Sequence, residues 1–227
     1  MMENKTIHYC WFGKGKKSRR ILKCIKSWKK FFPDWSIKEW NEENFDIHIN
    51  KYVEQAYDNK KWAFVSDYAR LWILYNYGGI YFDTDVLVVK SFSDIKHPIL
   101  SIERGIDYDI APGLVMSCEK TNQVCLYIMK QYESDKFILD NGFNKKTICD
   151  RFTELFSKNG FVKEDKMQEI LGFNIYPTEF FCPYDNYRKI KNTTSNTHSI
   201  HLYLGSWLSG RERLSYFLNY LKRKIFK

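Results

Sequence analysis

Two aspartates separated by one residue interrupt an apolar segment of the chain. Asp83 and Asp85 lie in the sequence IYFDTDVLVV, residues 80–89, which otherwise has the composition of a buried strand. Side chains two positions apart on a strand project to the same face, where two carboxylates repel each other unless a cation lies between them. Hard oxygen ligands suit Mg²⁺ or Mn²⁺. The pair therefore predicts a metal site, and the alternative is a polar turn with both acids in water.

A second charged pair precedes this segment. Asp67 and Arg70 are three positions apart in a predicted helix over residues 63–77, so they share one face. The sequence DYARLWILYNY is apolar on nearly every side, which predicts a buried helix in which the arginine needs a carboxylate or phosphate partner. The pair is interpreted either as part of a functional site or as a helix-capping Asp67 with a structural ion pair.

The surrounding pattern predicts the elements that position these residues. Strands are expected over 5–12 and 35–40 with a helix over 18–32 between them, which favours an α/β fold with parallel pairing. The helix over 63–77 is expected to start at Ser66 or Asp67 and to end at Gly78. Weaker signals predict strands over 98–103, 113–117 and 174–177, helices over 121–132, 145–159 and 210–224, and a mobile loop over 191–199.

Composition excludes some classes of protein. With 227 residues, of which 44% are apolar, the chain has ample apolar surface for a core, which excludes a disordered protein. The six cysteines form no C-x-x-C pair, so we expect reduced core residues in a cytoplasmic protein. No secretory leader and no membrane-spanning run is apparent. The net charge of +9 is concentrated over 5–30 and 211–227. The latter segment predicts a basic helix that either lies on an anionic membrane or packs on the core.

Three ordered segments resemble one enzyme family. SDYARLWILYNYGGIYFDTDV (residues 66–86), IHYCWFGKG (7–15) and IHLYLGSW (200–207) are similar to the region around the Asp-x-Asp motif and its flanking elements in family 32 glycosyltransferases. That family includes bacterial capsule and polysaccharide transferases and the yeast mannosyltransferase group, and the segments also resemble the clostridial glucosylating toxins. The resemblance implies a GT-A fold, a Rossmann-like mixed sheet flanked by helices in a single domain. Its nucleotide-sugar half would span 1–95, its acceptor half 96–210, and its basic C-terminal helix 211–227.

The resemblance also implies roles for individual residues. Asp85 would ligate the metal, and Asp83 would approach both the ribose and the metal. Asp67 and Arg70 would hold hydroxyls of the donor sugar. The remaining implied contacts are Trp11 with the base, Tyr81 with the nucleotide, His201 with the metal or diphosphate, and Ser206 and Trp207 with the leaving diphosphate.

The implied reaction is transfer of a hexose, with retention, from a nucleoside diphosphate sugar such as UDP-galactose, UDP-glucose or an N-acetylated relative. The acceptor would be a saccharide of a surface polysaccharide, either free or linked to lipid and reached from the inner face of the membrane. The sequence presents no clear nucleophile, which favours front-side attack. Asp107 and Asp109 repeat the motif spacing without a preceding apolar strand and are interpreted as a decoy.

Two other classes of function remain open from the sequence. A phosphatase of the haloacid dehalogenase type also places an Asp-x-Asp motif after an apolar strand, but it needs the motif near the start of the chain and a later acidic element. A nucleic-acid-binding module would use the basic clusters and the aromatic residues. The aromatic residues are spread through predicted core segments, so no nucleic-acid partner is expected.

Overall fold

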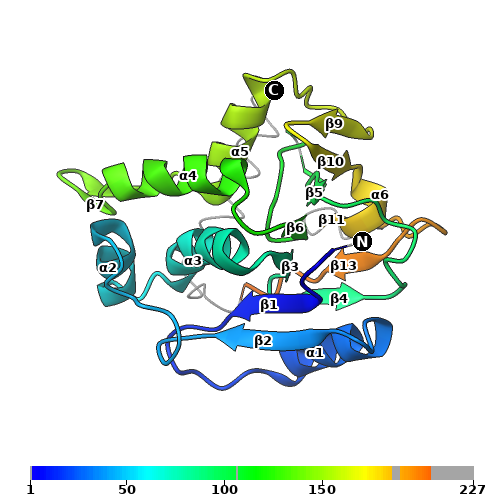
Figure 1. Cartoon of the computed structure of the whole chain (residues 1–227), viewed down its shortest axis with the longest axis horizontal. Helices are drawn as coiled ribbons and strands as arrows, with labels where there is room; N and C mark the ends of the chain where they lie inside the picture. Colours follow the sequence, from blue (N-terminus) through cyan, green and yellow to red (C-terminus); the bar gives the residue numbers. More distant parts are fainter. Residues whose placement is uncertain (1, 106, 186–189, 206–227) are drawn as a thin grey trace.

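The fold is built on a seven-stranded mixed sheet flanked by helices (Figure 1). The computed structural model describes residues 2–105, 107–185 and 190–205. The strand order is β2-β1-β3-β6-β5-β10-β9. Strands β2, β1 and β3 are parallel, whereas β6 is antiparallel to both β3 and β5. Strand β10 is parallel to β5 and antiparallel to β9. The predicted α/β architecture, a mixed sheet flanked by helices, is therefore confirmed.

The helices and strands have the following bounds. The strands of the main sheet are β1 Thr6–Cys10, β2 Ser36–Trp40, β3 Gly79–Tyr81, β5 Ile99–Ser101, β6 Met116–Cys118, β9 Gln168–Ile170 and β10 Phe173–Tyr176. The helices are α1 Arg19–Phe31, α2 Lys51–Asp58, α3 Trp62–Tyr77, α4 Gln123–Ser134, α5 Ile148–Ser157 and α6 Thr178–Phe181. Three strand pairs lie outside this sheet: β4 Val86–Val88 with β13 Ser199–His201, β7 Ile138–Leu139 with β8 Gly142–Phe143, and β11 Tyr184–Asp185 with β12 Ile190–Lys191.

The first half of the chain changes direction at the carboxyl ends of β1 and β3. From β1 the chain passes through α1 to β2 on one side, whereas β3 adds to β1 on the other side. This reversal of direction is a topological switch point, where parallel sheets bind their ligands. The residues that follow β1 and β3 are Trp11 and the segment that carries Asp83.

Local signals explain where the first helices begin and end. The Ser18 side chain accepts a hydrogen bond from the backbone N–H of Ile21 at the start of α1, as expected for an N-cap. Helix α3 ends at Gly78, whose positive φ of 66° is accessible to glycine at little cost. Gly79 has φ 101°, and an added Cβ there would approach the carbonyl oxygen of Thr6 in the neighbouring strand. These two glycines allow the chain to turn directly from α3 into β3.

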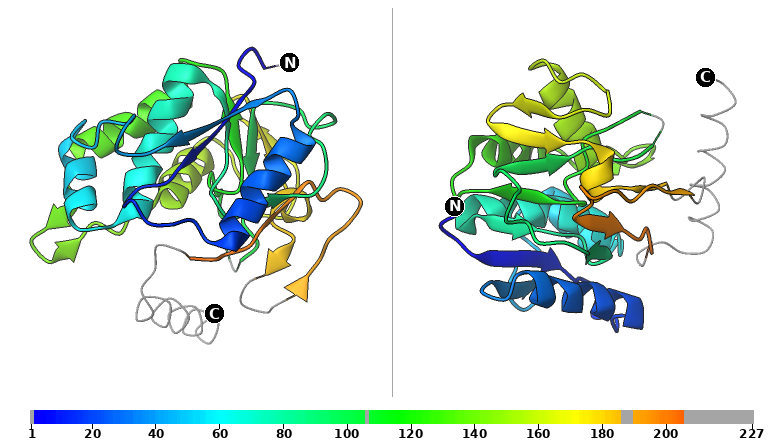
Figure 2. Two further views of the ribbon diagram at one scale, coloured as in Figure 1. Left: turned by 90° about the horizontal axis from the view of Figure 1, so that it is seen from below. Right: turned by 90° about the vertical axis from the view of Figure 1, so that its right-hand side faces the viewer.

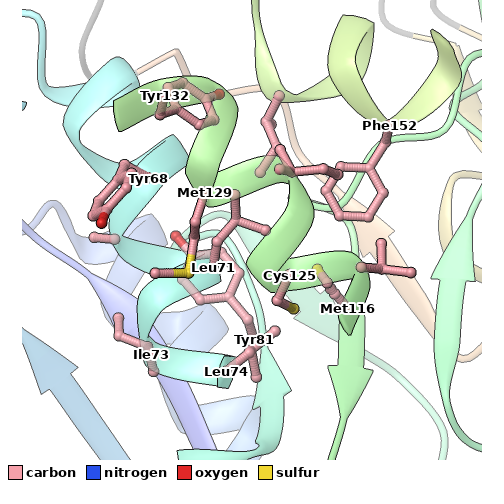
Figure 3. Packing of buried hydrophobic residues seen from close by; sticks show 14 of the residues in the cluster. Tyr68, Leu71, Ile73, Leu74, Tyr81, Met116, Cys125, Met129, Tyr132 and Phe152 are labelled. Carbon is pink, nitrogen blue, oxygen red and sulfur yellow. The ribbon is translucent and has the colours of Figure 1, made fainter. Parts of the chain in front are cut away.

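Apolar side chains cover both faces of the sheet. On one face, α3 and α4 pack together and enclose Tyr81 of β3, as Figure 3 shows. On the other face, Trp28 of α1 packs against Phe82, and its indole N–H donates to the carbonyl oxygen of Val86. The segment from β3 to β4 is thereby held between the two layers.

The structure corrects three of the expected elements. The continuous strand over 80–89 is wrong, because the chain leaves the main sheet after Tyr81, turns at Thr84 and Asp85, and resumes as β4 in a pair with β13. The capping interpretation of Asp67 is also wrong, because α3 begins at Trp62 and Asp67 lies within it. The loop predicted over 191–199 ends in β13 at Ser199. The expected helix over 210–224 lies outside the described residues.

The sequence did not predict several short elements. Helix α2 and the pairs β7–β8 and β11–β12 are too short to give a clear periodic pattern, and β9 pairs only with β10. All six cysteines are free, as expected. Within the described ranges, every helix is too short or too polar to cross a bilayer.

His8 gives the fold a testable dependence on pH. Its Nδ1 accepts from the Trp40 indole at 3.1 Å and its Nε2 lies 3.0 Å from the carbonyl oxygen of Gly78, a pattern that fits the neutral ring. Burial lowers the pKa of His8 to about 4. Between the unfolded pKa of about 6.5 and pH 4 the unfolded chain binds a proton that the folded chain does not, so lowering the pH over this window destabilises the fold.

We expect this histidine to contribute about 3 kcal/mol to the loss of stability between pH 7 and pH 4. Urea unfolding of the wild-type protein and of the His8→Asn variant at several pH values measures this contribution to the free energy of unfolding. The difference in free energy of unfolding between the two should shrink as the pH falls. Burial raises the pKa of Asp67 to about 6, so this residue makes the fold more stable as the pH falls. Because Asp67 is present in both proteins, its effect does not change the difference between them. A difference that stays constant with pH would contradict the prediction.

Candidate active site

Arg70 connects α3 to the acidic segment after β3. Its Nη2 lies 3.1 Å from Oδ1 of Asp67 and 3.3 Å from Oδ1 of Asp83, and its guanidinium lies 4.7 Å from the centre of the Tyr81 ring. The Tyr81 hydroxyl donates to the same Asp83 oxygen at 3.1 Å. The predicted contact between Asp67 and Arg70 is therefore present, and it extends to the Asp-x-Asp motif.

Arg70, Asp67 and Asp83 differ in how far their side chains are buried, and burial shifts the pKa values of the two aspartates. Arg70 is 4% exposed and Asp67 7% exposed. Burial raises the pKa of Asp67 to about 6, while Arg70 and the backbone N–H of Ile148, which donates to Asp67 Oδ2 at 3.1 Å, favour the carboxylate. The Asp83 side chain retains 32% exposure. Partial burial raises the pKa of Asp83, and the charge of Asp85 acts in the same direction. Asp83 is thus the most accessible member of the group.

Asp85 forms a separate ion pair with a residue far away in the sequence. His201 Nε2 lies 3.0 Å from Asp85 Oδ1, and the backbone N–H of Leu204 donates to Oδ2 at 2.8 Å. Burial opposes ionisation, but the nearby His201 outweighs it and lowers the pKa of Asp85. Although burial acts to lower the pKa of His201, Asp85 raises it to about 9. The pairing of β4 with β13 places Val86 opposite His201, which brings the two side chains together.

Trp11 directly follows β1, at the same switch point of the sheet. Its side chain is partly buried, and its indole N–H donates to the carbonyl oxygen of Gly15 at 2.6 Å. The ammonium of Lys17 lies 5.3 Å from the centre of its ring and also pairs with Glu39 at 2.8 Å. The loop after β1 therefore presents an aromatic ring with a cation above it. Ser206 and Trp207, which were expected in this site, lie outside the described residues.

Sequence reasoning missed three residues of the site. Gly113 precedes β6, its carbonyl oxygen accepts from the Asp83 backbone N–H at 2.9 Å, and an added Cβ would overlap the Asp83 carboxylate. Glu103, which follows β5, lies within electrostatic range of His201 and Asp83, and burial raises its pKa. The Tyr203 ring lies 4.1 Å from that of His201. For Glu103 the available signal was its place at the end of the strand predicted over 98–103.

Asp109 of the Asp107–Asp109 repeat is paired with a lysine. Its carboxylate lies 2.6 Å from the ammonium of Lys163, and both side chains are more than one third exposed. Its backbone carbonyl accepts from the N–H of Glu103. The pair with Lys163 is an ordinary surface ion pair.

Comparison with known proteins shows that part of the chain matches a family model. Residues 18–103 match the family model described as "Glycosyltransferase sugar-binding region containing DXD motif". The Asp-x-Asp motif of this chain lies inside the matched residues. The matched residues run from α1 through β5 and include Asp67, Arg70, Asp83 and Asp85, and they make up less than half of the chain.

Individual proteins resemble the chain only in part. An uncharacterized protein of Arabidopsis thaliana, At4g19900, is 34% identical over 122 residues, which are 52% of this chain and 18% of that protein. The chain therefore spans less than a fifth of that relative's length. Among solved structures, the PaToxG glycosyltransferase has 19% identity and a TM-score of 0.48, over 68% of this chain and 69% of its own.

Two further solved structures align over most of the chain. A glycosyltransferase involved in the glycosylation of the major capsid of PBCV-1 has 14% identity and a TM-score of 0.48, covering 93% of this chain and 98% of its own. The galactosyltransferase LgtC, in complex with donor and acceptor sugar analogues, has 14% identity and a TM-score of 0.46, covering 94% and 95%.

The bridging role of Arg70 predicts a stability effect. Arg70→Met would leave two carboxylates without their cation, one of them fully buried, and should lower the free energy of unfolding by about 3–5 kcal/mol. Adding Asp67→Asn should recover part of this loss because it removes the more buried charge. Urea unfolding of both variants measures the effect. Lys51→Met, which breaks the exposed i,i+3 pair with Glu54, is the matched control. An Arg70→Met protein as stable as this control would refute the bridge.

The contact at Gly113 predicts a local effect on the motif. Gly113→Ala should displace the Asp83 carboxylate, because the new methyl group would occupy its position and would also lie 3.0 Å from Nη1 of Arg70. We expect a fall of at least about tenfold, or 1.4 kcal/mol, in the affinity for a nucleoside diphosphate, measured by calorimetry. Gly105→Ala is the control, because an added Cβ there meets nothing within 4 Å. Equal affinity of the two variants would contradict the assignment of Asp83 to the site.

Proposed function

We propose that the protein is a retaining, metal-dependent glycosyltransferase that moves a hexose from a nucleoside diphosphate sugar to a saccharide. The observation that carries the proposal is the position of the Asp-x-Asp motif. It lies at a topological switch point, is held from one side by Arg70 and from the other by His201, and falls inside the matched sugar-binding region. The proposed unit is one domain, with a donor half over 1–95, an acceptor half over 96–210 and a basic helix over 211–227.

The donor set fits a divalent cation shared with the substrate. Asp83, Asp85 and His201 supply carboxylate oxygens and an imidazole, which suit Mn²⁺ or Mg²⁺. Among the described residues, no group of three His, Cys, Asp or Glu side chains is already assembled around a metal position. In this proposal the cation would take its other ligands from phosphate oxygens and water, as Mg²⁺ commonly does. Nδ1 of His201 is buried without a hydrogen-bond partner among the described residues, so this nitrogen is not committed to another protein group.

The remaining site residues would bind and orient the donor. Trp11 offers an aromatic face to the base, and Tyr81 fixes the Asp83 carboxylate beside the nucleotide. Asp67 and Arg70 would contact hydroxyls of the sugar, with Arg70 held by its two acidic partners. Ser206 and Trp207 are proposed to donate hydrogen bonds to the leaving diphosphate. The bound metal would neutralise charge that develops on that diphosphate.

The stereochemical course and the biological setting are part of the proposal. We infer retention by front-side attack, in which the leaving phosphate accepts the proton of the acceptor hydroxyl. The donor is proposed to be UDP-galactose, UDP-glucose or an N-acetylated relative, and the product a surface polysaccharide. A cytoplasmic location at the inner face of the membrane would present a lipid-linked acceptor. These details rest on the resemblance to family 32 transferases.

Donor hydrolysis tests the proposal without knowledge of the acceptor. Incubation with a panel of nucleoside diphosphate sugars and Mn²⁺ should release the nucleoside diphosphate slowly from at least one of them. Asp85→Asn should reduce this rate at least about a hundredfold, about 2.7 kcal/mol in barrier, because the proposed metal ligand loses its charge. Asp109→Asn, which alters the decoy motif, should leave the rate unchanged. Circular dichroism checks that both variants are folded.

Two outcomes would refute this function. One is full donor hydrolysis by Asp85→Asn. The other is steady Mg²⁺-dependent turnover of a generic phosphate ester together with no turnover of any nucleotide sugar. That result would favour a phosphatase.

A further inference from the structure

A polar cavity of about 440 Å³ lies apart from the Asp-x-Asp motif. It is formed by the residue after Glu103, by α6 and its neighbours, and by the loop that precedes β13. Figure 2 shows α6 and β13 on the same side of the molecule, and the two elements are in contact. The volume lies in the range of about 300–1,000 Å³ that is usual for small-molecule sites. The polar residues that line the cavity are Arg104, Asp165, Glu179, Asn192, Thr193 and Thr194.

One wall of the cavity is fixed by a hydrogen-bond network. The Asp165 carboxylate accepts from the backbone N–H of Thr178 at 2.6 Å and from its hydroxyl at 2.7 Å. Nη2 of Arg104 donates to the same hydroxyl at 2.8 Å. Nε of Arg104 is buried without a hydrogen-bond partner, a donor that normally costs free energy to leave unpaired. This wall therefore fixes the guanidinium of Arg104, whose side chain is 24% exposed and can present its other Nη hydrogens to a ligand.

The opposite wall is fixed by Glu179. Its carboxylate accepts from the Thr194 hydroxyl at 2.8 Å and from the Asn196 amide at 3.1 Å. A carboxylate has about four acceptor positions, so these two bonds leave capacity for a ligand. The loop that carries Thr194 is thus tied to α6, and the cavity does not depend on a ligand to form it.

A chain of direct contacts joins this cavity to the motif. The backbone N–H of Arg104 donates to Sγ of Cys182 at 3.2 Å, and this sulfur lies 3.0 Å from the Tyr203 hydroxyl. The Tyr203 ring packs on His201, which pairs with Asp85. Packed side chains of Cys182, Tyr203 and His201 therefore connect the cavity to the motif.

The charges of the cavity select the chemistry of its ligand. One guanidinium faces two carboxylates, so the lining carries a net negative charge and disfavours phosphate or another anion. The other lining groups are Pro177, which is apolar, and two hydroxyls and an amide, which both donate and accept. A neutral, hydroxyl-rich molecule satisfies such a set of mixed donors and acceptors, because each of its hydroxyls can also do both.

We propose that this cavity is the subsite for a neutral sugar ring of the acceptor, with Arg104 and Glu179 as its principal hydrogen-bonding residues. The acceptor role rests on the proposed transferase function, whereas the binding of a sugar does not. The subsite would hold the acceptor chain while its reactive hydroxyl extends past Tyr203 toward the donor.

Filling the cavity tests the proposal. Thr193→Trp places an indole in the cavity from a loop residue whose side chain makes none of the hydrogen bonds that fix the two walls. Ser195→Trp introduces the same side chain two residues away, at an exposed position outside the lining. Saturation-transfer NMR with the methyl glycosides of glucose, galactose, mannose and N-acetylglucosamine measures binding. At least one glycoside should bind the wild-type protein and Ser195→Trp, and its affinity for Thr193→Trp should fall at least about tenfold.

Donor hydrolysis by the same three proteins separates this proposal from the function of the motif. Hydrolysis should be equal in all three, because the cavity lies outside the donor site. Glycoside binding that is equal in the wild type and Thr193→Trp, or absent from the wild type, would overturn the subsite whatever the hydrolysis assay gives. A third result is that the wild-type protein hydrolyses no donor and still binds a glycoside that Thr193→Trp does not bind. That result would refute the transferase and support the sugar site. Thermal unfolding shows whether both variants keep the fold.

Discussion

The buried guanidinium of Arg70 is the interaction on which the donor site depends. A charge with 4% exposure is tolerated only when it is paired and hydrogen-bonded, and here two carboxylates and an aromatic ring surround it. The same contacts fix the side chain of Asp83 relative to α3. Because the Asp83 carboxylate is held by Arg70 and Tyr81 but remains about one third exposed, it is oriented and still has free acceptor capacity. That combination is what a residue needs in order to meet a cation or a ribose.

The break after β3 brings the second half of the site into place. If the apolar segment continued in the main sheet, Val86 would extend β3 and β13 would have no partner near the motif. The turn at Asp85 instead starts β4, whose pairing with β13 places His201 beside a carboxylate 116 residues earlier in the chain. The backbone N–H groups of Leu202 and Leu204 then bond to Asp85 as well. One aspartate therefore anchors the returning chain and also contributes to the site.

Local pattern predicted β1, α1, β2 and α3, where the N-cap of α1 and the glycine after α3 gave clear signals. It failed at the motif, where apolar residues on both sides concealed the change of sheet. It also failed at Asp67, because α3 begins at Trp62 without a side-chain cap and no local signal marks that start. Family resemblance supplied His201. Glu103 had a signal in its place at the end of a predicted strand, but Tyr203 and Gly113 approach the site only through tertiary contacts, which no spacing in the sequence reveals.

The two halves of the chain differ in how they form a binding surface. The Arg70 group rests on long, apolar elements, so its few charges are fixed by burial and are costly to move. The cavity in the second half uses short elements such as α6 and the loop before β13, and it relies on hydrogen bonds among polar side chains. Surface networks of this kind tolerate substitution better than buried charges do. Such an arrangement allows the second half to change its ligand while Arg70 and the motif keep the geometry that the chemistry requires.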